Sequence, residues 1–154
     1  MENTKSRGEI AAELFIKGYN CSQSIVGAFS DKLDVDFDTL MKLSSSFGSG
    51  MGRLREVCGA VSGMFMVIGL LMGYSSPDDF DAKKEHYARI QHLAQDFKDK
   101  HKTIVCRELL QNIKKTDGGV PEERTPEYYK ARPCAVFVHS AAEILDMYLK
   151  ENNL

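Results

Sequence analysis

Residues 57–72 read VCGAVSGMFMVIGLLM and form the longest apolar stretch of the chain. An α-helix rises about 1.5 Å per residue and the apolar core of a bilayer is about 30 Å thick, so a helix over these residues is too short to cross a membrane. The stretch therefore predicts a buried helix in the core of a globular protein, without insertion into a membrane.

Helical spacing of apolar residues continues on both sides of this stretch, and the alternation typical of strands does not persist. Upstream, the pattern predicts one helix over residues 10–16 and a second that is capped by Asn20, while Asp36 is placed to cap a third. Residues 44–52 follow as a loop of small side chains, which would break any helix.

Downstream, Ser76 and Pro77 predict the start of a long helix. The buried stripe of this helix is predicted to contain Phe80, Tyr87, Ile90, Leu93, Ala94 and Phe97. A short helix over residues 103–112, an irregular connection over residues 117–126 and a last helix opened by Pro133 complete the pattern. The sequence thus predicts an all-α protein, a single-domain helical bundle of about six or seven helices.

Length and charge agree with one domain over residues 1–154. The chain has 20 Lys and Arg against 22 Asp and Glu, a net charge of −2, and no basic run, which argues against a nucleic-acid partner. Charged residues interrupt its first twenty positions, so we expect no secretory leader and a cytoplasmic location.

Four cysteines, Cys21, Cys58, Cys106 and Cys134, are the candidate functional residues. None forms a CxxC pair, so their spacing alone names no cofactor. Each stands near a predicted helix start, where unpaired N–H groups and the positive end of the helix dipole stabilise a thiolate. This repeated placement predicts reactive thiols.

Arginines stand close in sequence to three of these cysteines: Arg53, Arg55, Arg107 and Arg132. A neighbouring guanidinium lowers the pKa of a thiol and raises its reactivity, so we expect the arginines to support the thiolates. The alternative interpretation is that the cysteines are inert core residues, because free cysteine is among the most buried residue types.

Small residues follow Cys58 at helical spacing. Gly59 and Gly63 are four residues apart and so face the same way on a helix, where they allow a neighbouring backbone to come close. This approach would bring a second cysteine within the Cα separation of about 5.5–6 Å that a disulfide needs, or it reflects tight helix packing alone. Residues 48–53 lack the pattern of a nucleotide-binding loop, and we expect them to cover Cys58.

The motifs around the cysteines resemble a known family. Residues 46–53 (SFGSGMGR) and 56–63 (EVCGAVSG) are similar to the central signature of the C_GCAxxG_C_C family, and the other cysteines occur in the family's order. After Cys134 the chain has Ala-Val where the family pattern leads us to expect Pro-Lys. The resemblance implies redox activity carried by the cysteines, without a named substrate.

Our leading hypothesis is a thiol–disulfide redox protein in which Cys58 is the attacking thiolate and Cys21, Cys106 or Cys134 resolves the intermediate. Its partner would be a redox protein or a small thiol. The alternative is a module without catalysis in which all four thiolates bind zinc or an iron–sulfur cluster. A third interpretation is a structural bundle with cysteines as core residues. The sequence leaves the pairing of the cysteines and the oligomeric state open.

Overall fold

The computed structural model describes residues 4–154, most of which are helical. In chain order the elements are α1 (Arg7–Ile16), α2 (Cys21–Ala28), the 3-10 turn η1 (Ser30–Lys32), α3 (Phe37–Ser45), α4 (Gly48–Met51), α5 (Gly59–Met72), α6 (Phe80–His101), α7 (Cys106–Leu109), α8 (Pro126–Ala131) and α9 (Cys134–Glu151). In this described part, six helices have eight residues or more. The predicted all-α fold is therefore confirmed.

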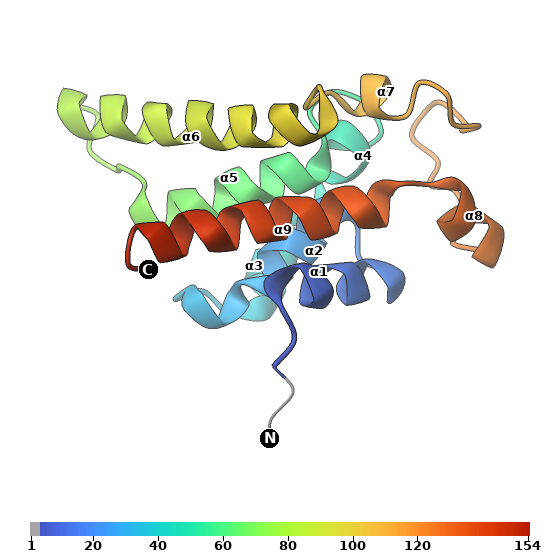
Figure 1. Cartoon of the computed structure of the whole chain (residues 1–154), viewed down its shortest axis with the longest axis horizontal. Helices are drawn as coiled ribbons and strands as arrows, with labels where there is room; N and C mark the ends of the chain where they lie inside the picture. The colour runs from blue at the N-terminus through green and yellow to red at the C-terminus, as the bar shows by residue number, and fades with distance from the viewer. Residues whose placement is uncertain (1–3) are drawn as a thin grey trace.

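Helices α5 and α9 run through the middle of the molecule, with α6 on one side and α1 to α3 on the other (Figure 1). Helix α5 packs against α2, α4, α6 and α9, while α9 also packs against α1 and α2. Most of residues 58–68 are buried and form the centre that the sequence predicts, whereas Leu70, near the end of α5, is 46% exposed. The largest fully buried side chains come from several helices and include Phe29, Leu40, Met64, Ile68, Leu93 and Leu145.

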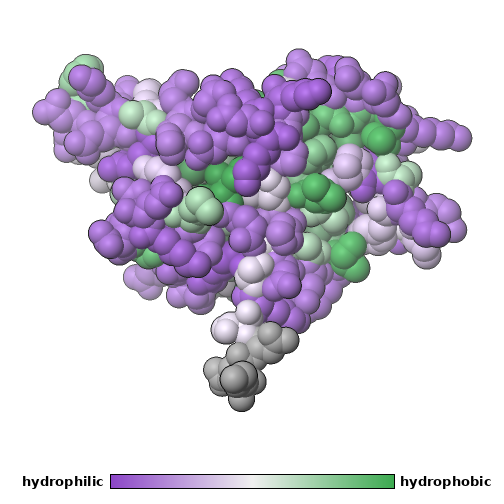
Figure 2. Space-filling model, viewed as in Figure 1, coloured by the Kyte–Doolittle hydropathy of each residue, from purple (hydrophilic) through white to green (hydrophobic). Residues whose placement is uncertain are grey.

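The outer face seen in Figure 2 is mostly hydrophilic, and hydrophobic side chains show between α6 and the helices below it. Within residues 4–154, no helix combines the length and the apolar character that a membrane span requires.

Side-chain caps fix the starts of α2, whose first residue is Cys21, and of α3. The Asn20 side chain accepts a hydrogen bond from the Gln23 N–H at 2.9 Å, and the Gln23 side chain accepts one from the Asn20 N–H at 3.0 Å. This reciprocal capping box satisfies two backbone donors at the start of α2. Asp36 likewise accepts from the Thr39 N–H at 3.0 Å and begins α3, so both predicted caps are confirmed.

The prediction for the start of α6 is wrong. Helix α6 begins at Phe80, with Asp79 accepting from the Ala82 N–H at 3.0 Å, and Pro77 lies before the helix. Phe80 is 73% exposed and Tyr87 53% exposed, so neither belongs to the buried stripe. The reason is that this end of α6 extends beyond the rest of the bundle (Figure 1).

Two segments near the cysteines also differ from prediction. Residues 103–105 are not helical, because Val105 forms an antiparallel bridge with Val57, and α7 is therefore only four residues long. A helix that the sequence did not predict, α8, follows the expected irregular connection and is capped by Thr125 through a hydrogen bond from the Tyr128 N–H at 3.1 Å.

Candidate functional site

The four cysteines all occupy helix starts. Cys21, Cys106 and Cys134 are the first residues of α2, α7 and α9, and Cys58 is the N-cap of α5. All four line one small cavity of about 20 Å³, which we term the cysteine cavity. The fold therefore brings together residues that are distant in the chain.

Glycines on α5 let α2 approach closely. A Cβ on Gly59 would collide with the Cys21 Sγ, and one on Gly63 would lie 2.8 Å from the Ile25 Cβ and 2.9 Å from the Ser22 carbonyl oxygen. Both positions face α2, as the four-residue spacing predicts. The close approach predicted from the sequence is confirmed, and it places the Cys21 thiol against the residue that follows Cys58.

A short antiparallel pairing joins Cys58 to Cys106. The Cys58 N–H donates to the Ile104 carbonyl at 2.7 Å, and the Cys106 N–H donates to the Glu56 carbonyl at 2.6 Å. Gly50 closes the other side, since a Cβ there would lie 2.8 Å from the Cys106 Cβ. An isolated bridge has no strand pattern to detect, so the sequence did not predict this contact.

The turn before α5 contacts Cys21. Ser49, Gly50 and Gly52 have φ values of 56°, 71° and 59°, and in this left-handed turn the Ser49 N–H donates to the Cys21 Sγ at 3.4 Å. Glycine adopts this conformation without a steric penalty. The turn therefore supplies a backbone donor to Cys21.

Burial controls the acidity of three of the thiols. It raises the pKa of Cys21 despite the Ser49 N–H, and it raises that of Cys58 well above its usual range, with the neighbouring Cys21 adding to the effect. Burial also raises the pKa of Cys134 to about 12, although Arg132 acts in the opposite direction. The lowered pKa values that helix starts and arginines led us to expect are therefore wrong for these three thiols, because desolvation outweighs both effects.

The predicted supporting arginines have different positions. Arg55 is 3% exposed and lines the cysteine cavity. Arg53 instead donates to the carbonyls of Thr116, at 2.7 Å, and Val120. Arg107 is exposed, donates to the Leu54 carbonyl and does not line the cavity.

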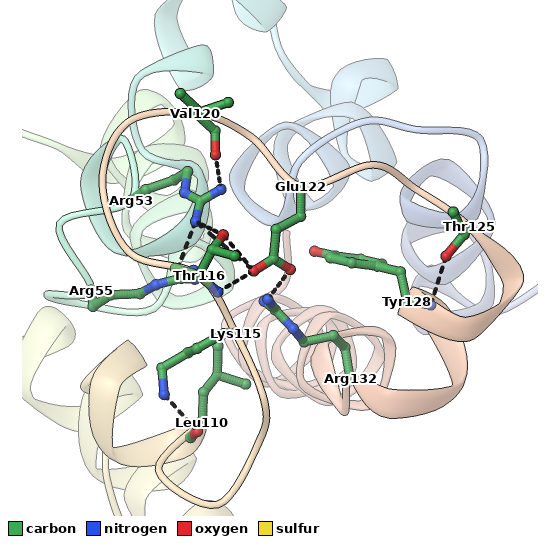
Figure 3. A network of polar contacts seen from close by, with 10 residues as sticks. All are labelled: Arg53, Arg55, Leu110, Lys115, Thr116, Val120, Glu122, Thr125, Tyr128 and Arg132. Carbon is green, nitrogen blue, oxygen red and sulfur yellow. Dashed lines mark hydrogen bonds and ion pairs between the residues drawn. The ribbon is translucent and has the colours of Figure 1, made fainter.

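Further residues of the cavity wall come from α8 and from the segments directly before and after it. Arg124, Tyr128 and Arg132 line the cysteine cavity, and Arg132 forms an ion pair with Glu122 (Figure 3). The sequence could identify Arg132 as a residue of the site, because it stands two residues before Cys134, whereas nothing in the sequence indicates that Arg124 belongs there.

All four cysteines are free thiols. Among residues 4–154, no three histidine, cysteine, aspartate or glutamate side chains form a group able to hold a metal ion. The zinc or iron–sulfur site that we gave as the alternative is thus not formed in this arrangement of side chains.

Comparison with known proteins adds a family. No curated protein and no solved structure matched the chain. A sequence model of the family described as "Putative redox-active protein (C_GCAxxG_C_C)" matches residues 19–148, a range that contains all four cysteines of the cavity. Since the match covers most of the sequence, the chain belongs to the C_GCAxxG_C_C family.

Proposed function

We propose that this protein is a thiol–disulfide redox protein and that Cys21 and Cys58 are its exchanging pair. The observation that carries the proposal is the convergence of four cysteines from four helix starts on one cavity. Inert core cysteines would not require that convergence, nor would an apolar core include the guanidinium groups of Arg55, Arg124 and Arg132. Membership of a family described as redox-active supports the same conclusion.

The environments of the two thiols favour a division of roles. Cys21 is half-buried and accepts a hydrogen bond from the Ser49 N–H, which stabilises its thiolate relative to the thiol. Cys58 is 7% exposed. We therefore give Cys21 the first attack and Cys58 the resolving step, which reverses the order predicted from the sequence.

The reaction transfers two electrons. The Cys21 thiolate attacks one sulfur of a substrate disulfide, forms a mixed disulfide and releases the first substrate thiolate. The Cys58 thiol then loses its proton, attacks the Cys21 sulfur and releases the second substrate thiolate. The Cys21–Cys58 disulfide forms, the substrate disulfide is reduced, and the two protons of the protein thiols end on the released thiols.

Oxidation with an uncharged disulfide tests this proposal. Fully reduced protein is incubated with 2-hydroxyethyl disulfide at pH 7 and pH 9, alkylated and mapped by mass spectrometry. We expect the loss of two free thiols per chain and a peptide that joins Cys21 to Cys58, with faster reaction at pH 9 because burial raises both pKa values.

Single variants separate the two steps. Cys58→Ser should stop at the mixed disulfide on Cys21, whereas Cys21→Ser should lose no pair of thiols. Cys106→Ser and Cys134→Ser should still lose two thiols, because neither has a role in the proposed exchange. Four free thiols after exposure at both pH values would refute the function, and a bond between other cysteines would refute the assignment of the pair.

Metal analysis separates this proposal from the four-thiolate alternative. Protein purified without oxygen should contain no stoichiometric zinc or iron and should have no visible absorption from a cluster. A full equivalent of either metal would instead favour the binding module, because thiolates that ligate a metal are not free to exchange.

A further inference from the structure

A second cavity, of about 400 Å³, adjoins the cysteine cavity. We term it the arginine cavity, because its lining contains four arginines and a single carboxylate: Arg53, Arg55, Arg124, Arg132 and Glu122. The two cavities share the wall residues Ser49, Arg55, Arg124, Tyr128 and Arg132. An occupant of the arginine cavity would therefore lie against the wall that separates it from the four thiols.

Arg55 has donors without partners in this wall. Its Nη2 donates to the Thr116 carbonyl at 3.1 Å, but its Nε and Nη1 are buried and have no hydrogen-bond partner among residues 4–154, and the same holds for the Nε of Arg53. Arg55 as a whole is 3% exposed. Buried charged donors are almost always hydrogen-bonded, so unmet ones at a cavity wall point to an acceptor that belongs there.

The charge of the lining favours an anion. Figure 3 shows Arg53 and Arg132 directed toward Glu122, which accepts from Arg132 and lies 3.9 Å from the Nη2 of Arg53. Burial would raise the pKa of Glu122, but hydrogen bonds from Thr116 and the two arginine charges lower it overall. This carboxylate is therefore ionised at neutral pH, and it offsets only one of the four guanidinium groups in the lining.

This positive charge is local, because the chain as a whole carries a net charge of −2. A concave site lined by one sign of charge concentrates ligands of the opposite sign. Guanidinium groups present a planar fork of donors that matches a carboxylate. A cavity of about 400 Å³ also lies within the usual range for small-molecule sites.

We propose that the arginine cavity binds the carboxylate of a low-molecular-weight disulfide or thiol, with Arg55 as the principal binding residue. This assignment rests on the proposed redox function and names its substrate class: a small anionic sulfur compound in place of a partner protein. Ser49 links the two sites, since it lines the arginine cavity and donates to the Cys21 Sγ. The carboxylate would hold the disulfide beside Cys21, which attacks it as described above and releases a carboxylate-bearing thiol.

Binding is tested separately from exchange. S-methylglutathione carries carboxylates and has no sulfur available for exchange, so its calorimetric titration into reduced protein measures the anion site alone. We expect saturable binding that weakens as salt is raised. Arg55→Gln should weaken it about tenfold or more, because a charge-assisted hydrogen bond is lost. Arg89→Gln, an arginine of α6 outside both cavities, is the matched control and should bind as the wild type does.

If Arg55→Gln does not fold, the same test can be made on the wild-type protein by changing the ligand. The carboxyl-esterified form of S-methylglutathione should bind at least tenfold more weakly to the wild-type protein. In the exchange assay, glutathione disulfide should oxidise the thiols faster than the uncharged 2-hydroxyethyl disulfide, and the cationic cystamine should be slowest. These results together would support the assignment.

Three outcomes would overturn it. Absence of S-methylglutathione binding in a protein that exchanges normally with 2-hydroxyethyl disulfide would refute the anionic substrate and leave the redox function standing. Tighter binding of inorganic phosphate than of S-methylglutathione would refute the carboxylate assignment. Binding of S-methylglutathione without exchange with any disulfide would refute the redox function and, with it, the assignment to a sulfur compound.

Discussion

Replacing Cys134 by serine should change how the stability of the protein depends on pH. Burial raises the pKa of this thiol from its ordinary 9.0 to about 12. Between these values the unfolded chain loses the proton and the folded protein keeps it, so unfolding becomes more favourable as pH rises. Stability from this group is fully present below pH 9.0 and is lost as pH rises toward 12.

The size of the effect follows from the shift. One pKa unit corresponds to about 1.4 kcal/mol, and pH 10 lies one unit above the ordinary pKa of the thiol. Between pH 7 and pH 10 the free energy of unfolding of the wild type should therefore fall by about 1.4 kcal/mol more than that of Cys134→Ser, whose hydroxyl does not ionise. Because Cys134 is half-buried, solvent screening makes this an upper value. Urea unfolding under reducing conditions at pH 7, 8, 9 and 10 measures the difference, and tyrosine and lysine titrations cancel between the two proteins.

A constant difference across this range would refute the argument that burial controls the thiol. If the wild type instead loses stability relative to Cys134→Ser as pH falls, the pKa of Cys134 is lowered in the folded protein. Arg132 and the start of α9 would then hold Cys134 as a thiolate.

Three further substitutions test the packing and the charge pairing of the site. Gly59→Ala should destabilise the protein by about 1–3 kcal/mol, since its Cβ would collide with the Cys21 Sγ, whereas Gly69→Ala on the same helix has open space and should stabilise it by about 0.5–1 kcal/mol; equal effects in thermal unfolding would argue against the close approach of α2. Glu122→Gln should cost about 1–3 kcal/mol because it leaves the buried Arg132 without its carboxylate. The lowered pKa of Glu122 means that this stabilisation is lost as pH falls, so the variant should have the flatter acid limb.

The sequence predicted those features of the fold that depend only on residues close together in the chain, such as helix caps. Asn20 and Asp36 cap helices because a side-chain oxygen three residues before an N–H can reach it, and this relation is visible in the sequence. The exposed Phe80 shows the limit of such signals, because an apolar residue at helical spacing is buried only where another element covers it.

The cavities depend on contacts between distant segments. The bridge between Val57 and Val105 has no pattern of its own, yet it determines where α7 begins and brings Cys106 to Cys58. Arg124 reaches the site because its Nη atoms donate to the carbonyls of Phe15, at 3.2 Å, and Tyr19, at 3.3 Å, more than one hundred residues earlier. No spacing rule connects positions so far apart.

The acidity of the thiols illustrates a second limit. A helix dipole contributes about 0.3–1 kcal/mol to an exposed charge, and this contribution can be recognised from a cysteine at a helix start. Complete burial shifts a pKa by up to about 3–5 units, which is several times larger in free energy, and it acts in the opposite direction on a thiol. The sequence shows the smaller effect, and only the packed fold shows the larger one. Because Cys58 has the more strongly raised pKa and Cys21 retains the Ser49 N–H, burial also decides which thiol attacks first in the proposed exchange.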